Sequence, residues 1–77
     1  MVGTSAEYQD RVKRYLKAEL KRAGVSYADL AARLTERGLP ETEGSITVKI
    51  NRGGFSAWFL VASLEVIGIN SLRIISD

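Results

Sequence analysis

The sequence contains no cysteine and no histidine. Without cysteine the chain can form neither a disulfide framework nor a thiolate metal site. Without histidine it lacks the usual general base and the commonest metal ligand in proteins. The sequence also lacks a Gly-rich phosphate-binding loop and a cluster of carboxylates at metal-ligand spacing. We therefore expect no enzymatic activity, no catalytic residue, no metal, no cofactor and no small-molecule substrate.

Long apolar runs are also missing. The longest such stretch, residues 58–67, is interrupted by Ser63 and Glu65, and it is far too short to span a bilayer. The first five residues do not combine a basic region with an apolar run, so they do not resemble a signal peptide. These features predict a cytoplasmic protein without membrane contact.

The composition fits one small globular domain. The chain has 77 residues, of which 45% are hydrophobic and 26% charged. Residues 1–6 are expected to form a flexible tail, and residues 7–77 a single domain. The formal net charge is only +2, but six of the eleven basic residues lie within residues 11–22 beside one acid. That stretch therefore carries +5 and could attract an anionic partner.

Four helices are predicted from apolar residues at helical spacing and from residues typical of helix ends. The first expected helix covers residues 7–23 and ends before Gly24. The second runs from the cap Ser26 to Gly38, and the third from the cap Thr42 to Gly53. The fourth runs from the cap Ser56 to Ile67 and Gly68. After Asn70, strand-forming residues such as Leu72, Ile74 and Ile75 predict a short terminal strand.

Several local patterns support these boundaries and assign the buried faces. Asp29 stands three residues after the cap Ser26, in capping-box position. Phe55 and Leu60 flank the cap of the fourth helix as a hydrophobic staple would. The inward-facing residues are expected to be Leu30, Ala31 and Leu34 in the second helix and Ile46 and Ile50 in the third.

Two short helices joined by a Gly-containing turn form the helix-turn-helix arrangement. The run LKRAGVSYADLAARL (residues 20–34) resembles the opening "lk..G.s..eLA..l" of lambda-repressor-like (Cro-type) DNA-binding domains. SITVKINRG (residues 45–53) is similar to their third-helix segment "s.Is..ErG", and residues 60–69, ending in VIGI, are similar to their fourth helix. The chain also resembles a small bacterial family of uncharacterised short proteins, with the same "G-V-S-Y-x-x-L" and "S-I-x-x-K-I-x-R-G-x-F-S" runs.

The resemblance implies an all-α, compact four-helix, lambda-repressor-like helix-turn-helix domain, here with a short C-terminal strand. It implies a small DNA-binding protein, a transcriptional regulator that reads duplex DNA with its third helix as a homodimer. The alternative is a protein–protein interaction module that keeps the fold without binding DNA. Three features favour this alternative: the low net charge, the apolar fourth helix, and a turn between the second and third helices that is longer than the family's tight turn.

The candidate DNA-binding residues are polar, cationic or exposed side chains of the third helix and lysines of the first. Hydroxyl, amide and cationic groups can reach base edges and phosphates, whereas nearby Glu41 and Glu43 would repel phosphates. The basic face of the first helix has an ordinary alternative, a solvated surface. The candidates are Thr42, Ser45, Thr47, Val48, Lys49, Asn51, Arg52, Lys17 and Lys21.

The fourth helix is apolar nearly all round, and a domain this small cannot bury every face of it. Large exposed apolar patches usually mark interfaces, so a homodimer is expected through this helix and the terminal segment. The alternative is a helix covered within the chain by the first helix and the strand. The candidate interface residues are Trp58, Phe59, Val61, Val66, Leu72 and Ile74.

Overall fold

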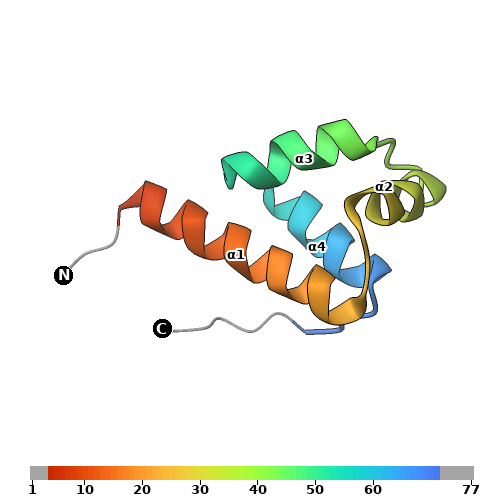
Figure 1. Cartoon of the computed structure of the whole chain (residues 1–77), viewed down its shortest axis with the longest axis horizontal. Helices are drawn as coiled ribbons and strands as arrows, with labels where there is room; N and C mark the ends of the chain where they lie inside the picture. Colours follow the sequence, from red (N-terminus) through yellow and green to blue (C-terminus); the bar gives the residue numbers. More distant parts are fainter. Residues whose placement is uncertain (1–3, 72–77) are drawn as a thin grey trace.

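Four helices follow one another in the computed structural model, which describes residues 4–71 (Figure 1). They are α1 (Ser5–Ala23), α2 (Tyr27–Glu36), α3 (Glu43–Arg52) and α4 (Ala57–Val66). The described residues contain no strand, which confirms the all-helical class for this part of the chain. The strand expected around Leu72 and Ile74 lies outside the described residues.

The N-terminal end of α1 differs from the expectation. The Thr4 hydroxyl accepts a hydrogen bond from the Glu7 amide at 3.1 Å, and the Glu7 carboxylate accepts one from the Thr4 amide at 2.7 Å. This reciprocal capping box satisfies two backbone donors that would otherwise have no partner. The helix therefore begins at Ser5 rather than near Glu7, and residues 4–6, predicted as tail, belong to its capped end.

The caps of the later helices largely follow the sequence. The Ser26 hydroxyl accepts from the Asp29 amide at 3.1 Å, while the Asp29 carboxylate lies 3.6 Å from Arg33. Thr42 caps α3 through a complete capping box with Ser45. Ser56 occupies the N-cap position of α4 but makes no side-chain cap hydrogen bond, so only its position was predicted correctly.

The core lies where the four helices meet: α2 packs against α3 and α4, and α1 packs against the same two helices. The predicted inner faces of α2 and α3 are buried, including Ile46 and Ile50 with no exposed surface. Phe55 and Leu60 both pack against this core. The buried apolar residues are Leu16, Leu20, Val25, Leu30, Ala31, Leu34, Ile46, Ile50, Phe59 and Leu64.

Arg33 of α2 and Arg37, which caps its C-terminal end, hold the C-terminal end of α4. Arg33 donates a hydrogen bond from Nη1 to the Val66 carbonyl at 3.0 Å, and Arg37 pairs with Glu65 at 3.1 Å. Cations are favourable there because the last carbonyls of a helix carry a partial negative charge. Although α4 is strongly apolar, no helix within residues 4–71 is both long and apolar enough to cross a membrane.

One glycine sets how closely α1 approaches the end of α3. Gly53 ends α3 with a left-handed φ of 70°. A Cβ atom added there would lie 2.6 Å from the backbone carbonyl oxygen of Gln9 in α1. The two backbones thus meet at a distance that only glycine allows. The position of α3 relative to α1 depends on this contact.

Candidate nucleic-acid interface

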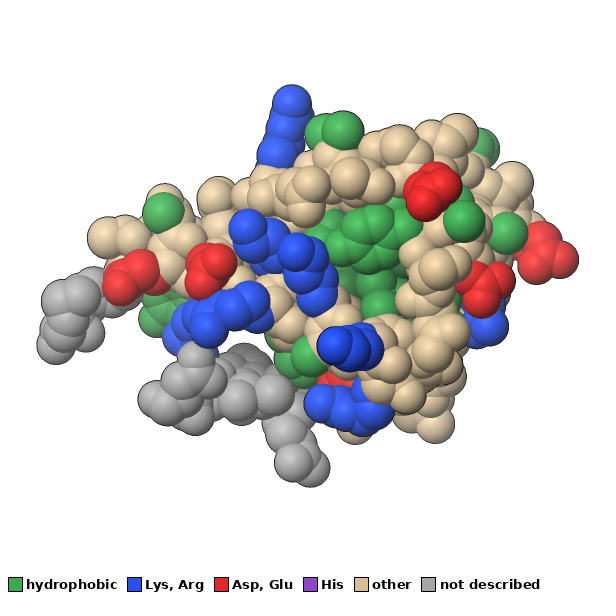
Figure 2. All heavy atoms as spheres, in the orientation of Figure 1, with side chains coloured by type: hydrophobic (Ala, Val, Ile, Leu, Met, Phe, Trp, Pro, Cys, Tyr) green, Lys and Arg blue, Asp and Glu red, His purple; other side chains and the backbone are tan. Residues whose placement is uncertain are grey.

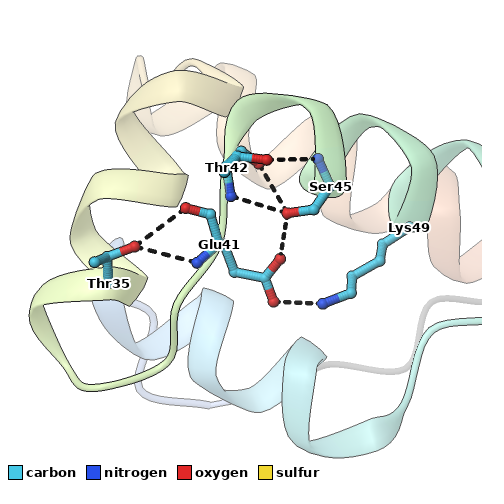
Figure 3. Close-up of polar contacts among 5 residues, drawn as sticks. All are labelled: Thr35, Glu41, Thr42, Ser45 and Lys49. Carbon is cyan, nitrogen blue, oxygen red and sulfur yellow. Dashed lines mark hydrogen bonds and ion pairs between the residues drawn. The ribbon is translucent and has the colours of Figure 1, made fainter.

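The Thr35 hydroxyl holds the end of the turn between α2 and α3. Thr35, near the end of α2, accepts a hydrogen bond from the Glu41 amide and donates one to the Glu41 carbonyl, each at 3.2 Å. Both backbone groups of Glu41 are therefore satisfied by one side chain (Figure 3). The longer turn that the sequence indicated is consequently a defined connection, and it fixes where α3 begins.

The Glu41 carboxylate lies against the first turns of α3. Its side chain is only 3% exposed, and it accepts a hydrogen bond from the Ser45 hydroxyl at 2.6 Å. Its second oxygen pairs with the Lys49 ammonium, whose side chain remains 38% exposed. The Lys49 nitrogen also lies 5.8 Å from the centre of the Trp58 ring and 5.2 Å from that of Phe59.

Thr35, Glu41, Thr42, Ser45 and Lys49 form one connected set of polar contacts, the Glu41 network (Figure 3). Three of its members were candidate DNA-binding residues. Thr42 uses its hydroxyl to cap the Ser45 amide at 3.1 Å, and Ser45 and Lys49 both point to Glu41. These side chains stabilise the start of α3. Their polar groups are therefore engaged within the protein.

A fourth candidate, Thr47, is half-buried, and its hydroxyl donates to the Glu43 carbonyl one turn earlier at 2.8 Å. Such a bond back to the preceding turn is common for threonine in helices. It leaves the Thr47 methyl group and the two lone pairs of the hydroxyl oxygen for other contacts.

The remaining candidates on α3 form one exposed stripe. Val48, Asn51 and Arg52 are exposed, and Gly44 lies one turn before Val48 on the same side of the helix. This stripe points away from the buried Ile46 and Ile50. Within residues 4–71, none of its side chains makes a hydrogen bond or an ion pair. We call Gly44, Val48, Asn51 and Arg52 the outer face of α3.

The basic stretch of α1 is partly neutralised by its own neighbours. Arg14 pairs with Asp10 at 2.9 Å, and Arg22 pairs with Glu19 at 2.8 Å. Lys13 donates to the Asn51 carbonyl at 3.4 Å, at the C-terminal end of α3. This contact places the face of α1 that carries Lys13 next to the C-terminal end of α3.

Lys17 and Lys21 follow Lys13 at intervals of one helical turn and are exposed. Neither makes an ion pair or hydrogen bond to any residue of the 4–71 segment. Figure 2 shows Lys and Arg side chains spread along α1, beside a patch of hydrophobic side chains. Lys17, Lys21 and Arg52 are therefore exposed cations without an ion pair to any residue from 4 to 71.

The predicted dimer interface is only partly exposed. Phe59 is completely buried and packs edge-on against Phe55 and Trp58, so its assignment to an interface was wrong. Val66 is half-buried against the core. Trp58 and Val61 remain 54% and 51% exposed, one turn apart on α4. Leu72 and Ile74 lie outside the described residues.

Comparison with known proteins gives one family. A family model described as "Domain of unknown function (DUF6471)" matches residues 8–72. The chain belongs to the DUF6471 family. The match begins within α1 and extends past α4, so the Glu41 network, the outer face of α3 and the exposed lysines all lie within the DUF6471 domain. No curated protein and no solved structure matches the chain significantly.

Sequence reasoning missed the role of Glu41, which it treated only as an acid that would repel phosphate. The sequence does contain a pattern that indicates this role. Glu41, Ser45 and Lys49 are spaced four residues apart, so in a helix their side chains would lie on one face. The contact between Gln9 and Gly53 joins positions that are far apart in the chain. No local pattern could have indicated it.

Proposed function

We propose that this DUF6471 domain is a small DNA-binding protein, a transcriptional regulator of the lambda-repressor-like helix-turn-helix type. In this proposal α2 and α3 are the two helices of the motif, and α3 enters the major groove of duplex DNA. The observation that carries it is the outer face of α3, whose exposed side chains have no partner within residues 4–71. An amide, a cation and an apolar side chain on one exposed helix face match the edges that DNA presents in its major groove.

Electrostatics supports the same partner. Arg52 at the end of α3 and Lys17 and Lys21 on α1 are exposed cations without an ion pair in the described part of the chain. Contacts between such cations and phosphates fix a protein on the duplex without reading its sequence. Glu43, exposed in the first turn of α3, opposes this attraction, so the expected affinity depends on few cations.

A titration of duplex DNA at several salt concentrations, followed by fluorescence anisotropy, tests the proposal. Three phosphate contacts predict a slope of roughly −3 for log affinity against log salt concentration. Replacing Lys17 and Lys21 by glutamine should reduce the steepness of that slope by about 2. Arg37→Gln is the matched control, because Arg37 is already paired with Glu65. Absence of binding at low salt would overturn the proposal.

We further propose that the protein acts as a homodimer through α4. Trp58 and Val61 present two large apolar side chains, each about half exposed, on one side of this helix. Burying them against a second copy would remove that surface from water and place two α3 helices for a two-fold symmetric site. The same surface also supports the second candidate function, an interaction module that binds another protein rather than DNA.

Light scattering on the full chain measures the mass in solution. We expect a dimer, and we expect Trp58→Ser with Val61→Ser to give a folded monomer, because both side chains are exposed in the single chain. A monomeric wild-type protein would contradict the dimer. If the wild type also bound no DNA, the interaction module would become the better proposal.

A further inference from the structure

The outer face of α3 has an unusual chemical composition for a surface that contacts DNA. Val48 is 49% exposed and offers only methyl groups. Gly44, one turn before it, has no side chain, and a Cβ built there would find only the Thr42 hydroxyl, 3.8 Å away. Asn51, one turn after Val48, offers an amide that both donates and accepts.

Two polar groups of α3 beside the outer face, the Lys49 ammonium and the Ser45 hydroxyl, are already occupied. The Lys49 ammonium, a donor suited to guanine, pairs with Glu41 and lies over two aromatic rings. The Ser45 hydroxyl is bound to the same carboxylate. Arg52 is the last residue of α3, beyond Val48 and Asn51, where it can serve a phosphate.

We propose that this outer face selects adjacent A·T base pairs, a deepening that rests on the proposed DNA binding. Val48 packs against the C5-methyl group of a thymine, and Asn51 forms two hydrogen bonds with N6 and N7 of an adenine. Residues three apart rise about 4.5 Å along a helix, close to the spacing of about 3.4 Å between base pairs, so the two contacts fall on neighbouring pairs. The absent side chain at Gly44 lets the edge of the groove approach the α3 backbone.

The test begins with selection of duplexes from a random library by the full-length protein. Two modified versions of the selected duplex then serve as probes. One carries deoxyuridine in place of thymidine and lacks the methyl group, and the other carries 7-deazaadenine and lacks N7. Wild-type affinity should fall about fourfold for the first, since one buried methyl is lost. It should fall about tenfold for the second, since a two-bond contact is broken.

Each variant should lose one of these effects. Val48→Ala should bind the thymidine and deoxyuridine duplexes alike and keep its sensitivity to 7-deazaadenine. Asn51→Ala should show the opposite pattern. Gly44→Gln should weaken DNA binding at least tenfold by blocking the approach, yet leave the urea midpoint unchanged or higher, because glutamine favours a helix over glycine.

The outcomes separate the two proposals. If the wild type binds no duplex at low salt, DNA binding itself fails. If the wild type binds DNA but selects G·C-rich duplexes, the inference about A·T pairs fails while DNA binding stands. The same conclusion follows if the variants respond to both probes just as the wild type does. Circular dichroism of each variant is the control that tests whether it is folded, so that a lost preference is not attributed to unfolding.

Discussion

Gly53→Ala is expected to destabilise the protein by about 4 kcal/mol. The left-handed backbone at Gly53, with φ of 70°, costs any residue with a Cβ about 1 to 2 kcal/mol. The new methyl group would also lie 2.6 Å from the Gln9 carbonyl oxygen, and forcing such a group into packed structure costs typically 1 to 3 kcal/mol. The neighbour is backbone of α1, which cannot move aside as a flexible side chain would.

Gly24→Ala is the matched control for this prediction. Gly24 ends α1 with a nearly identical φ of 72°, but a Cβ there would meet nothing within 4 Å. It should therefore cost only the backbone strain, about 1 to 2 kcal/mol. Urea unfolding followed by far-UV circular dichroism gives both values. Equal losses in the two variants would show that the approach of α1 to α3 does not constrain residue 53.

Lys49→Met is expected to cost about 3 kcal/mol, more than the substitution of its partner. It leaves the Glu41 carboxylate, 3% exposed, with the Ser45 hydroxyl as its remaining side-chain contact. An uncompensated charge in such a place is strongly unfavourable. Glu41→Gln should cost only about 1 kcal/mol, since the Lys49 side chain is 38% exposed and its ammonium can reach water.

The double variant of Glu41→Gln and Lys49→Met completes the cycle. It contains neither charge, so it should be more stable than Lys49→Met alone. Urea midpoints of the four proteins, measured at one pH and salt concentration, give the coupling energy. If the two single changes cost the same and the double change costs their sum, Lys49 does not stabilise the Glu41 carboxylate.

The two pairs of variants also bear on function. Gly53 positions the C-terminal end of α3 against α1, whereas the Glu41 network fixes its N-terminal end against α2. Together these contacts fix both ends of the helix that carries the outer face. A reading helix needs this rigidity, because side chains must meet base edges within hydrogen-bond distance.

Local patterns in the sequence predicted the helix ends and the buried faces that depend on residues within one or two helical turns. The ends of α2 and α3 follow from Ser26, Thr42 and the glycines, because caps act within one helical turn. The buried residues Ile46 and Ile50 follow from their spacing. The apolar spacing predicts the start of α1 too late, because the capping box formed by Thr4 and Glu7 extends the helix to Ser5.

The sequence by itself determined the four helices and their inner faces, since helical periodicity and capping are encoded within a few residues. Only the tertiary structure decided which of the side chains predicted to be exposed are buried or paired with another residue. It buried Phe59, because a helix that is apolar nearly all round gives no pattern to distinguish its inner side. It paired Lys49 with Glu41 and left the side chains of Val48 and Asn51 without a hydrogen bond to any residue from 4 to 71. Such pairings depend on how separate helices pack, and no spacing within one helix specifies that packing.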